Sequence, residues 1–360
     1  MAAATRILQG LCAGIFLGCL LNLPVTATAQ QFDARTQELI EGAQKEGSLV
    51  YIDNLMAPES RDAMNAAFVK HYGLKNFTVT QYLLKSSEVV ARVEQELRAE
   101  KVSADVVLVN VTTFWGSMQK QGALANYCSP EYTAFTAFSK TGIPDGGCFY
   151  KAAYGVAFTP MWNPKFVKDD LDSWEKLVDP KYKGQIIFSD PLKGDVYLDT
   201  YIGLRKILDV AWFKKMAAQK PIFLVRSTDI RDKVMTGEYP VAVLGYAPRA
   251  YQSRKDVELR VSYPKEGVVV MGGFAGIMAK AAHPNAARLW TDFFFGKEGQ
   301  EVLQKYEAVI SGRGDLAVNP EVSKFVPTVD QIKIVPVDWA SLTEKDRDAA
   351  RAEYRSLFGK

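Results

Sequence analysis

Histidine is scarce in this chain of 360 residues, which contains only His71 and His283. Histidine is the commonest metal ligand and the side chain most often used as a general acid or base. With no third histidine, a zinc site of the usual ligand sets is not expected. We expect structural roles instead, because His71 closes an amphipathic helix and His283 precedes Pro284, which suits a first helical position.

The common sequence motifs of catalysis and nucleotide binding are also missing. The chain has no Gly-x-Ser-x-Gly elbow, no Walker loop and no Gly-x-Gly-x-x-Gly after its first strand. Gly272, Gly273 and Gly276 fall within an extended apolar stretch, which suits close strand packing better than a phosphate cradle. We therefore expect no enzymatic step, no metal and no cofactor. Acid–base chemistry by carboxylates alone leaves a secreted hydrolase as the catalytic alternative.

Neither sign of charge dominates the chain, which has 44 Lys and Arg against 41 Asp and Glu. No basic run clusters as nucleic-acid binding would need, so no nucleic-acid partner is expected. Apolar residues make up 48 % and charged residues 24 %, which is ordinary for a globular protein. A chain of this length usually forms two domains.

A long apolar run occurs only at the N-terminus. Residues 7–23 are mostly apolar, Arg6 precedes them, and Ala27-Thr28-Ala29 gives a small-x-small cleavage site. This pattern predicts a secretion signal over residues 1–29 and export to the periplasm. Leu17-Gly18-Cys19 weakly resembles a lipoprotein cleavage site, but cleavage there would leave an apolar N-terminus. No later stretch reaches the roughly 18 apolar residues that a membrane span needs.

Cysteine is limited to four residues, of which Cys12 and Cys19 fall within the predicted signal. The mature chain keeps only Cys128 and Cys148. Two cysteines close in sequence and in an oxidising compartment predict one disulfide. The alternative is a pair of free, buried thiols.

Strand and helix patterns alternate along the mature chain, and the alternation restarts after a turn-rich segment that carries both cysteines. Apolar patterning predicts strands at 48–52, 77–82, 104–110, 154–159, 185–189, 222–226, 241–245, 257–263 and 268–279. It predicts helices at 59–71, 88–100, 195–208, 227–236, 284–295 and 299–305. This spacing is typical of an α/β fold with mixed, mostly parallel sheets flanked by helices.

Two successive α/β units, followed by a return of the chain, predict two lobes. We assign residues 30–154 and 270–335 to lobe 1 and residues 155–269 to lobe 2, with hinge strands near 150–159 and 263–273. The tail, residues 336–360, contains Ser341-Leu-Thr-Glu344, a capping-box spacing, and then a charged amphipathic helix. We expect this C-terminal helix to pack on one lobe.

Four segments spread over nearly the whole mature chain resemble one protein family. They are Ala43–Tyr51, Ser86-Ser87 with Arg92–Glu100, Trp174–Ile187, and Ala282–Trp290 with Phe293, Glu298, Gly299 and Gln300. Together they resemble family-1 extracellular solute-binding proteins of ABC importers, in the branch that includes ferric-iron-binding proteins. The resemblance implies a type II periplasmic-binding-protein fold, a solute site between two lobes, closure on the solute, docking to a membrane permease, and a monomer.

In open α/β sheets, ligands sit outside the carboxyl ends of the strands, where helices begin. That rule selects candidate ligand-binding residues after each predicted strand. In lobe 1 they are Asp53, Asn54, Ser86, Ser87, Thr112, Thr113 and Trp115; in lobe 2 they are Asp190, Gly194, Asp195, Arg226, Ser227, Thr228, Tyr246 and Arg249. Structural alternatives remain for several of them: helix capping for Ser86-Ser87 and Ser227-Thr228, core packing for Trp115, a salt bridge across the lobe for Arg226, and the start of a solvated helix for Arg249.

Arg226 ends an apolar strand and opens a helix, a place where a guanidinium can bind a carboxylate or phosphate with two hydrogen bonds. In the iron-binding relatives, two adjacent tyrosines hold the ferric ion. In this chain Tyr246 is followed by Ala247, and Tyr251 lies about a turn further on. We therefore favour a small organic anion (a carboxylate, phosphonate or phosphate ester), with Trp115 and Tyr246 as aromatic walls. A ferric ion is the alternative solute.

Overall fold

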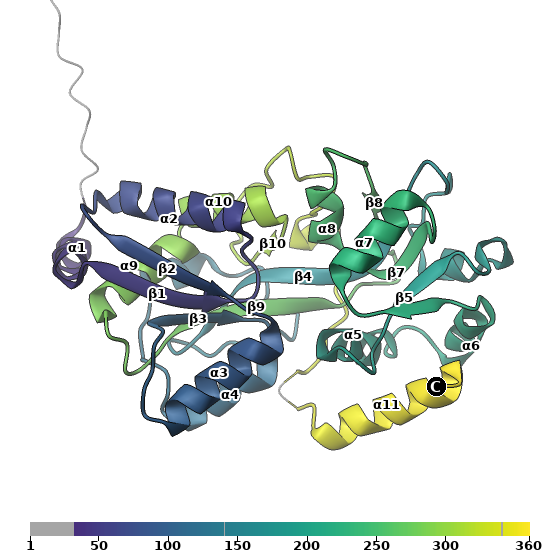
Figure 1. The fold of residues 1–360 in the computed structure, drawn as a ribbon, viewed down its shortest axis with the longest axis horizontal. Helices are drawn as coiled ribbons and strands as arrows, with labels where there is room; N and C mark the ends of the chain where they lie inside the picture. The colour runs from purple at the N-terminus through teal and green to yellow at the C-terminus, as the bar shows by residue number, and fades with distance from the viewer. Residues whose placement is uncertain (1–31, 140, 340) are drawn as a thin grey trace, which may run out of the picture.

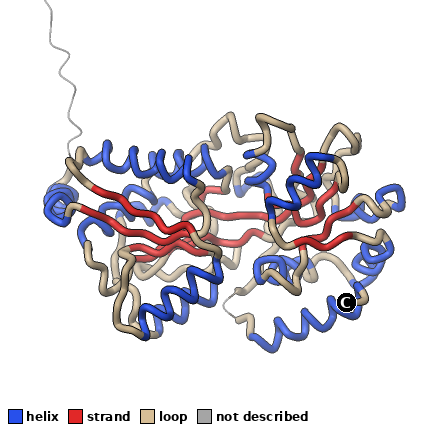
Figure 2. Tube along the Cα trace, viewed as in Figure 1, coloured by secondary structure: helices blue, strands red, loops and turns tan. Residues whose placement is uncertain are grey.

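The structure is a computed structural model that describes residues 32–139, 141–339 and 341–360 (Figure 1). The predicted secretion signal, residues 1–29, lies outside the described residues. A ten-stranded sheet runs through the molecule in the order β2-β1-β3-β9-β4-β7-β5-β6, and β8 and β10 pair with β4. Helices flank this sheet in two groups, which define the two lobes (Figure 2).

Lobe 1 is built on three parallel strands, β1 (Ser48–Asp53), β2 (Thr78–Leu83) and β3 (Val106–Val109). Its helices are α1 (Ala34–Glu46), α2 (Pro58–Tyr72), α3 (Ser86–Arg98), α4 (Thr112–Lys120), α9 (Pro284–Phe295) and α10 (Lys297–Glu307). Gly73 ends α2 in the left-handed conformation with φ 64°, which a glycine adopts without strain. Helix α4 occupies a segment for which the sequence pattern predicted no helix.

Lobe 2 repeats this plan with three parallel strands, β5 (Ile186–Ser189), β6 (Ile222–Leu224) and β7 (Val241–Tyr246). Its helices are α5 (Asp195–Leu204), α6 (Val210–Ala218), α7 (Ser227–Thr236) and α8 (Ala247–Gln252). Helix α6 was not predicted, and α8 is short and largely buried rather than solvated. Short 3-10 turns lie at Pro130–Ala134, Trp174–Val178, Pro180–Tyr182 and Val329–Gln331.

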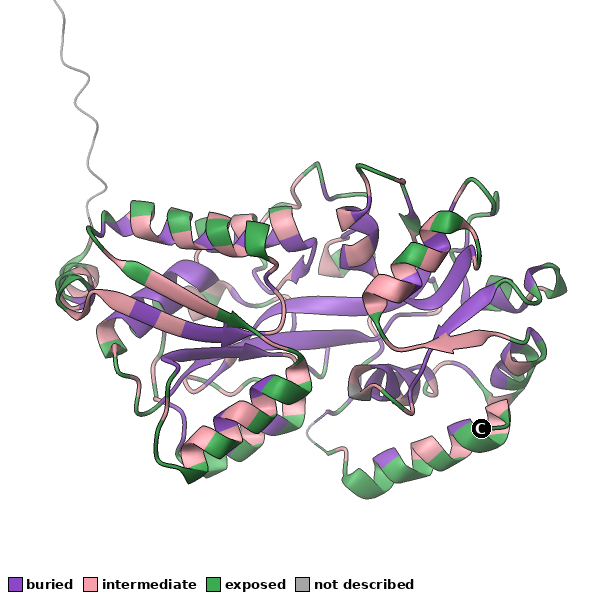
Figure 3. Cartoon of the chain, in the orientation of Figure 1, coloured by how far each residue is buried: buried purple, intermediate pink, exposed green. Residues whose placement is uncertain are grey.

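Two long antiparallel strands, β4 (Lys151–Trp162) and β9 (Val270–Ile277), cross between the lobes and are almost wholly buried (Figure 3). The first half of β4 pairs with β9 and the second half with β7. The register shifts between Thr159 and Met161, where Pro160 has no N–H to give to the ladder. The short strands β8 (Arg260–Val261) and β10 (Ile310–Ser311) pair at either end of β4. The residue boundaries of the lobes remain a prediction.

The C-terminal helix α11 (Glu344–Phe358) packs on α5 and α6 of lobe 2. Tyr354 is fully buried there, and Glu353 pairs with Arg205 at 3.0 Å. The capping box differs from the predicted one. Thr343, not Ser341, caps the helix and exchanges hydrogen bonds with Asp346, because the helix begins two residues later than the Ser341–Glu344 spacing implies.

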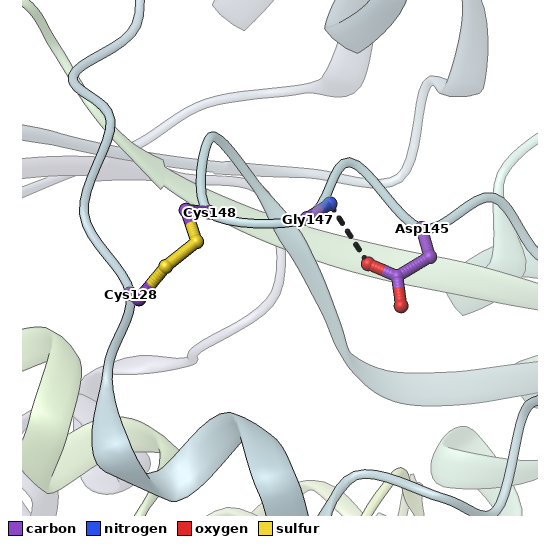
Figure 4. The surroundings of a disulfide bond; sticks show 4 residues. All are labelled: Cys128, Asp145, Gly147 and Cys148. Carbon is purple, nitrogen blue, oxygen red and sulfur yellow. Dashed lines mark hydrogen bonds between the residues drawn. A yellow bond between two sulfur atoms is a disulfide. The ribbon is translucent and has the colours of Figure 1, made fainter.

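Cys128 and Cys148 form a disulfide, with their Cα atoms 4.5 Å apart (Figure 4). This confirms the predicted disulfide over two free thiols. Beside it, Asp145 accepts the backbone N–H of Gly147 at 2.9 Å. Closing a loop of this length stabilises the fold by about 3 kcal/mol in the chain-entropy model. Among the described residues, no helix is both long and apolar enough to cross a membrane.

Candidate functional site

Asp53 ends β1 and is fully buried. Its Oδ1 accepts the backbone N–H groups of Leu55 (2.8 Å) and Met56 (2.9 Å), and its Oδ2 accepts the side-chain amide of Gln81. Burial disfavours the charged form and raises the pKa of Asp53 to about 6, although these hydrogen bonds oppose the shift. Asp53 therefore shapes the loop after β1 and offers no exposed oxygen to a solute.

Asn54, Ser86 and Asn110 follow three neighbouring strands and form one hydrogen-bonded group. The Asn54 amide donates to Ser86 at 2.8 Å and to Asn110 at 2.7 Å, and Ser86 donates to Asn110 at 2.9 Å. Ser86 is already the first residue of α3, so its side chain does not cap that helix. Ser87 is exposed beside it. The Asn54 carbonyl oxygen is buried without a partner and can therefore accept a hydrogen bond from a bound solute.

The third group of lobe 1 candidates begins α4. Thr112 is half-buried and Thr113 is exposed in its first turn, and no side chain caps the helix. Trp115 must be removed from the predicted aromatic walls. It is fully buried, its indole N–H donates to the Val109 carbonyl at 3.0 Å, and its ring stacks on Tyr150. The alternative of core packing is the one the structure shows.

Asp190, which we predicted to face the solute, is also bonded to other groups of the protein. It is only 2 % exposed; its Oδ1 accepts the N–H of Leu192 at 3.0 Å, and its Oδ2 pairs with the ammonium of Lys360 at 3.1 Å. Lys360 lies just beyond α11, so the C-terminal segment covers this carboxylate. Gly194 precedes α5 and leaves its start without a side-chain cap. The side chain of Asp195 lies outside the described residues.

Arg226 is the most exposed of the lobe 2 candidates whose side chains the structure describes, with 77 % of its side chain accessible. Its nearest carboxylate is Asp229 at 3.6 Å, one turn along α7, so the predicted alternative of a salt bridge across the lobe is not observed. Thr228 contacts the same carboxylate at 3.3 Å. An exposed local pair of this kind is weak, and Arg226 therefore remains available to bind an anion.

Arg249 lies in α8, directly after β7, and is held by two neutral side chains. Its Nε donates to the Ser227 hydroxyl at 3.2 Å, and its Nη1 donates to Gln252 at 2.5 Å. Among the described residues no carboxylate lies within ion-pair distance of this guanidinium. Tyr246, which precedes α8, stacks on Phe158 with ring centroids 5.3 Å apart. The Cζ atom of Arg249 lies 5.9 Å from the centroid of the Tyr246 ring. Arg249 is thus a fixed cation that, among the described residues, contacts no carboxylate directly.

Glu307 was not selected from the sequence, because it ends a helix rather than follows a strand. It is 2 % exposed; its Oε1 accepts the Ala57 N–H at 2.8 Å and the Ser60 hydroxyl, and its Oε2 accepts the Gln252 amide at 3.4 Å. Burial, with a smaller effect of the charge on Asp53, raises the pKa of Glu307 to about 7.

Five side chains from both lobes and the crossing strand form a group that we call the seam cluster: Asp53, Tyr154, Tyr246, Arg249 and Glu307. Tyr154, on β4, is buried, and burial raises its pKa, as do the nearby Tyr246, Asp53 and Glu307. Burial also raises the pKa of Tyr246, whereas Arg249 lowers it. The charge of Arg249 likewise lowers the pKa of Glu307. The cluster therefore joins the facing edges of the two lobes electrostatically.

Helices that begin after the strand ends of the two lobes lack side-chain caps. This holds for α4, α5 and α7, whereas α1, α6 and α11 begin elsewhere and are capped by Asp33, Asp209 and Thr343. Helices α9 and α10 are exceptions, since they also lack a side-chain cap. Uncapped first turns leave backbone N–H groups and partial positive charge for an anionic ligand.

Ser48, His283 and Asp105 have the bonding pattern of a hydrolytic triad. The Ser48 hydroxyl lies 2.9 Å from His283 Nε2, and His283 Nδ1 lies 2.8 Å from Asp105. Asp105 also accepts the N–H groups of Val50 and His283 itself, so the group ties β1, β3 and the start of α9 together. Ser48 begins β1, at the opposite end of that strand from Asp53 and the seam cluster. We assign this group a structural role.

Two further features bear on what the chain can bind. Among the described residues, no group of three or more His, Cys, Asp or Glu side chains could hold a metal ion.

A cavity of about 330 Å³, which we call the seam pocket, opens where α8 meets α2 and α10. Its lining residues are Glu59, Tyr251, Gln252, Arg254, Lys255, Lys305 and Tyr306.

Comparison with known proteins gives one family match. A family model described as a bacterial extracellular solute-binding protein matches residues 102–344. No curated protein sequence matches the chain.

Solved structures of similar fold cover most of the chain. They include iron-bound HitA from Pseudomonas aeruginosa (18 % identity, 86 % of this chain and 99 % of that chain, TM-score 0.66). AfuA from Actinobacillus pleuropneumoniae, with fructose 6-phosphate bound, is similar at 18 % identity over 87 % of this chain and 99 % of that chain, with a TM-score of 0.68. The substrate-binding protein of an ABC transporter from Agrobacterium tumefaciens reaches a TM-score of 0.70 at 15 % identity over 89 % and 96 % of the two chains. These likenesses confirm the two-lobed α/β fold.

Proposed function

The chain belongs to the bacterial extracellular solute-binding proteins, and we propose that it captures a small organic anion between its two lobes. The family match supports a location outside the cytoplasm. We propose that the protein is the solute-binding component of an ABC importer and that the membrane permease of this importer is its partner. The proposed solute is a carboxylate, a phosphonate or a phosphate ester. We propose further that the monomeric protein carries out no reaction on it.

Arg249 is the observation that carries this proposal. It is held in place by Ser227 and Gln252, it pairs with no carboxylate among the described residues, and it lies at the end of β7, where the fold class places ligands. Arg226 adds a second, exposed cation at the start of α7. The uncapped first turns of α4, α5 and α7 supply backbone donors for the same charge.

Lobe 1 supports a solute that also carries a hydrogen-bond donor. The buried carbonyl oxygen of Asn54 lacks a partner. Ser87, Thr112 and Thr113 offer hydroxyl groups, and they lie within three residues of Ser86 or Asn110, to which Asn54 is hydrogen-bonded. A hydroxyl or amino group on the anion would satisfy Asn54. A sugar phosphate or a hydroxy acid combines both features.

A ferric ion is the second candidate solute. It is favoured by the phenols of Tyr154 and Tyr246, which lie near two carboxylates in the seam cluster. Oxygen ligands of this kind suit hard cations. Against it, Tyr251 cannot complete a tyrosine pair, because it is buried and its hydroxyl donates to the Lys305 carbonyl at 2.6 Å.

A thermal-shift screen tests the proposal with organic acids, phosphonates, sugar phosphates, amines and ferric ion. A solute at 100 times its dissociation constant stabilises the folded state by about 2.7 kcal/mol, which such a screen detects. We expect the largest shift from an anion that also bears a hydroxyl or amino group. A shift from ferric ion alone, with a visible charge-transfer colour, would instead identify the second candidate.

A further inference from the structure

Gln252, the last residue of α8, lies between Arg249 and the opposite lobe. Its Oε1 accepts Nη1 of Arg249 at 2.5 Å, and its Nε2 donates to Oε2 of Glu307 at 3.4 Å. A guanidinium only donates hydrogen bonds and a carboxylate only accepts them, so one orientation of the amide satisfies both partners. The amide therefore forms a bridge with a defined direction.

Both ends of this bridge are anchored in a helix. On the side of lobe 2, Arg249 also donates to Ser227 in the first turn of α7. On the side of lobe 1, Glu307 accepts hydrogen bonds from Ala57 and Ser60 at the start of α2. A continuous chain of hydrogen bonds thus runs from α7 through α8 to α10 and α2, and so crosses from one lobe to the other.

We infer that Gln252 is a positioning residue that couples the capture of an anion by Arg249 to the approach of the two lobes. The inference rests on the proposed function, since it takes Arg249 as the anion-binding cation. Arg249 uses only some of its five N–H donors on Ser227 and Gln252, so the rest remain for a solute. When the lobes approach, Glu307 fixes Gln252, and Gln252 fixes the guanidinium in its binding position.

The coupling is reciprocal, as any linkage between two equilibria must be. If lobe closure orders Arg249, then an anion on Arg249 favours closure by the same factor. Couplings of this kind typically change affinity by about 5- to 150-fold. Loss of the bridge should therefore weaken anion binding within that range, even though Gln252 itself does not touch the anion.

Tyr251 provides the matched control, because it also joins the lobes but lies outside the chain of hydrogen bonds. Its hydroxyl donates to the Lys305 carbonyl in α10 at 2.6 Å. Tyr251→Phe removes this contact between the lobes and leaves the bonds of Arg249 untouched. This control distinguishes a variant that only weakens contact between the lobes from one that breaks the chain of hydrogen bonds through Gln252.

The test measures distances between spin labels on the two lobes in the solute-free protein. The labels replace exposed Gln95 of α3 and exposed Lys214 of α6, both changed to cysteine. We compare the parent protein with Gln252→Met, Arg249→Ala and the double variant, after circular dichroism has shown that each is folded. We expect both single changes to shift the distances to larger values. The double variant should add no further shift, because both changes break the same chain of hydrogen bonds.

Additive shifts, or distances that Arg249→Ala leaves unchanged while Gln252→Met alters them, would overturn the inference. Tyr251→Phe combined with Arg249→Ala should give additive shifts. Gln252→Glu supplies an independent test, and it also serves if Gln252→Met does not fold. It keeps an acceptor for Arg249 but sets a second carboxylate against Glu307, so we expect open distances at pH 8 and parent-like distances at pH 5.5, where Glu307 is protonated. Distances that do not respond to pH in this variant would also count against the inference.

These measurements contain no solute, so their failure is separate from a failure of the proposed function. If the shifts are additive but Arg249→Ala abolishes anion binding, the coupling role of Gln252 is wrong and the anion site stands. If the shifts follow the predicted pattern but no anion depends on Arg249, the bridge holds the lobes together, but the proposed anion site and its coupling to closure are both wrong.

Discussion

On the side of lobe 1, the buried polar groups of the seam cluster form most of their hydrogen bonds within the protein. Asp53 accepts three hydrogen bonds, and Glu307 accepts hydrogen bonds from α2 and from Gln252. On the side of lobe 2, Arg226 is mostly exposed, and the hydrogen bonds of Arg249 within the described part of the chain go to the neutral side chains of Ser227 and Gln252. The carboxylates of the seam cluster, Asp53 and Glu307, thus belong to lobe 1, and its cation, Arg249, belongs to lobe 2.

This difference suggests a structural role for the carboxylates of lobe 1 and a ligand-binding role for the cations of lobe 2. A buried, fully bonded carboxylate stabilises the loops around it and has no free oxygen for a ligand, whereas a positioned cation without a counter-ion attracts one. Lobe 1 therefore supplies a firm frame, in which the carbonyl oxygen of Asn54 is an unsatisfied acceptor. In the proposed function, lobe 2 supplies the charge that selects an anion. Substitutions on the two sides should accordingly affect different properties.

Glu307→Ala should have the largest effect on stability. It leaves the Ala57 N–H without an acceptor, leaves the Ser60 hydroxyl with the Ala57 carbonyl as its remaining acceptor, and opens a small cavity. We expect the free energy of unfolding at pH 5.5 to fall by about 4 kcal/mol, measured by chemical denaturation. A loss below about 1 kcal/mol would show that Glu307 does not anchor the frame of lobe 1.

The pH dependence of stability should also come from the carboxylates of lobe 1. The pKa of Glu307 is raised by burial from 4.5 to about 7 and that of Asp53 from 3.8 to about 6, so the folded state holds these protons more tightly than the unfolded chain. Their contribution is full below the unfolded pKa values and is lost as pH rises through the folded ones. We expect the free energy of unfolding to fall by on the order of 3 kcal/mol between pH 5 and pH 8.

Glu307→Gln is the control for this dependence, because the amide cannot titrate. Denaturation curves across the same pH range should lose the upper part of the fall, near pH 7, and keep the lower part that belongs to Asp53. An unchanged profile in this variant would assign the dependence to other groups.

Asn54→Ala tests the smaller hydrogen-bonded group of lobe 1. It removes the amide that joins Ser86 and Asn110, and we expect a loss of about 1 kcal/mol in the free energy of unfolding. Ser87→Ala, at the exposed neighbouring position, should leave stability unchanged. Equal losses in the two variants would contradict the assignment of this group.

Arg226→Ala on the opposite side should have the smallest effect on stability. Its side chain is exposed and its pair with Asp229 is local, so we expect a change within about 0.5 kcal/mol. Anion affinity should fall nonetheless. A stability loss comparable to that of Glu307→Ala would erase the distinction between the lobes.

The sequence patterns predicted many of the strands and helices and part of the candidate site. Apolar runs located the parallel strands, and the rule for strand ends placed Arg249 and Tyr246 where the seam cluster forms. Periodicity could not show that Trp115 faces the core, because a tryptophan one turn into a helix has the same pattern in either position. Glu307 follows no strand, and the partner of Asp190 lies 170 residues away, so only the tertiary structure brings them to their places.

The most direct measurement is calorimetric titration of the parent protein, Arg226→Ala and Arg249→Ala with the anion that stabilises the parent most. Truncating one partner of a buried charged pair typically weakens binding by at least 2 kcal/mol, or about 30-fold. We predict a loss of this size for Arg249→Ala and a smaller loss for Arg226→Ala, with both variants shown to be folded by circular dichroism. Anion affinity that Arg249→Ala leaves unchanged would contradict the account.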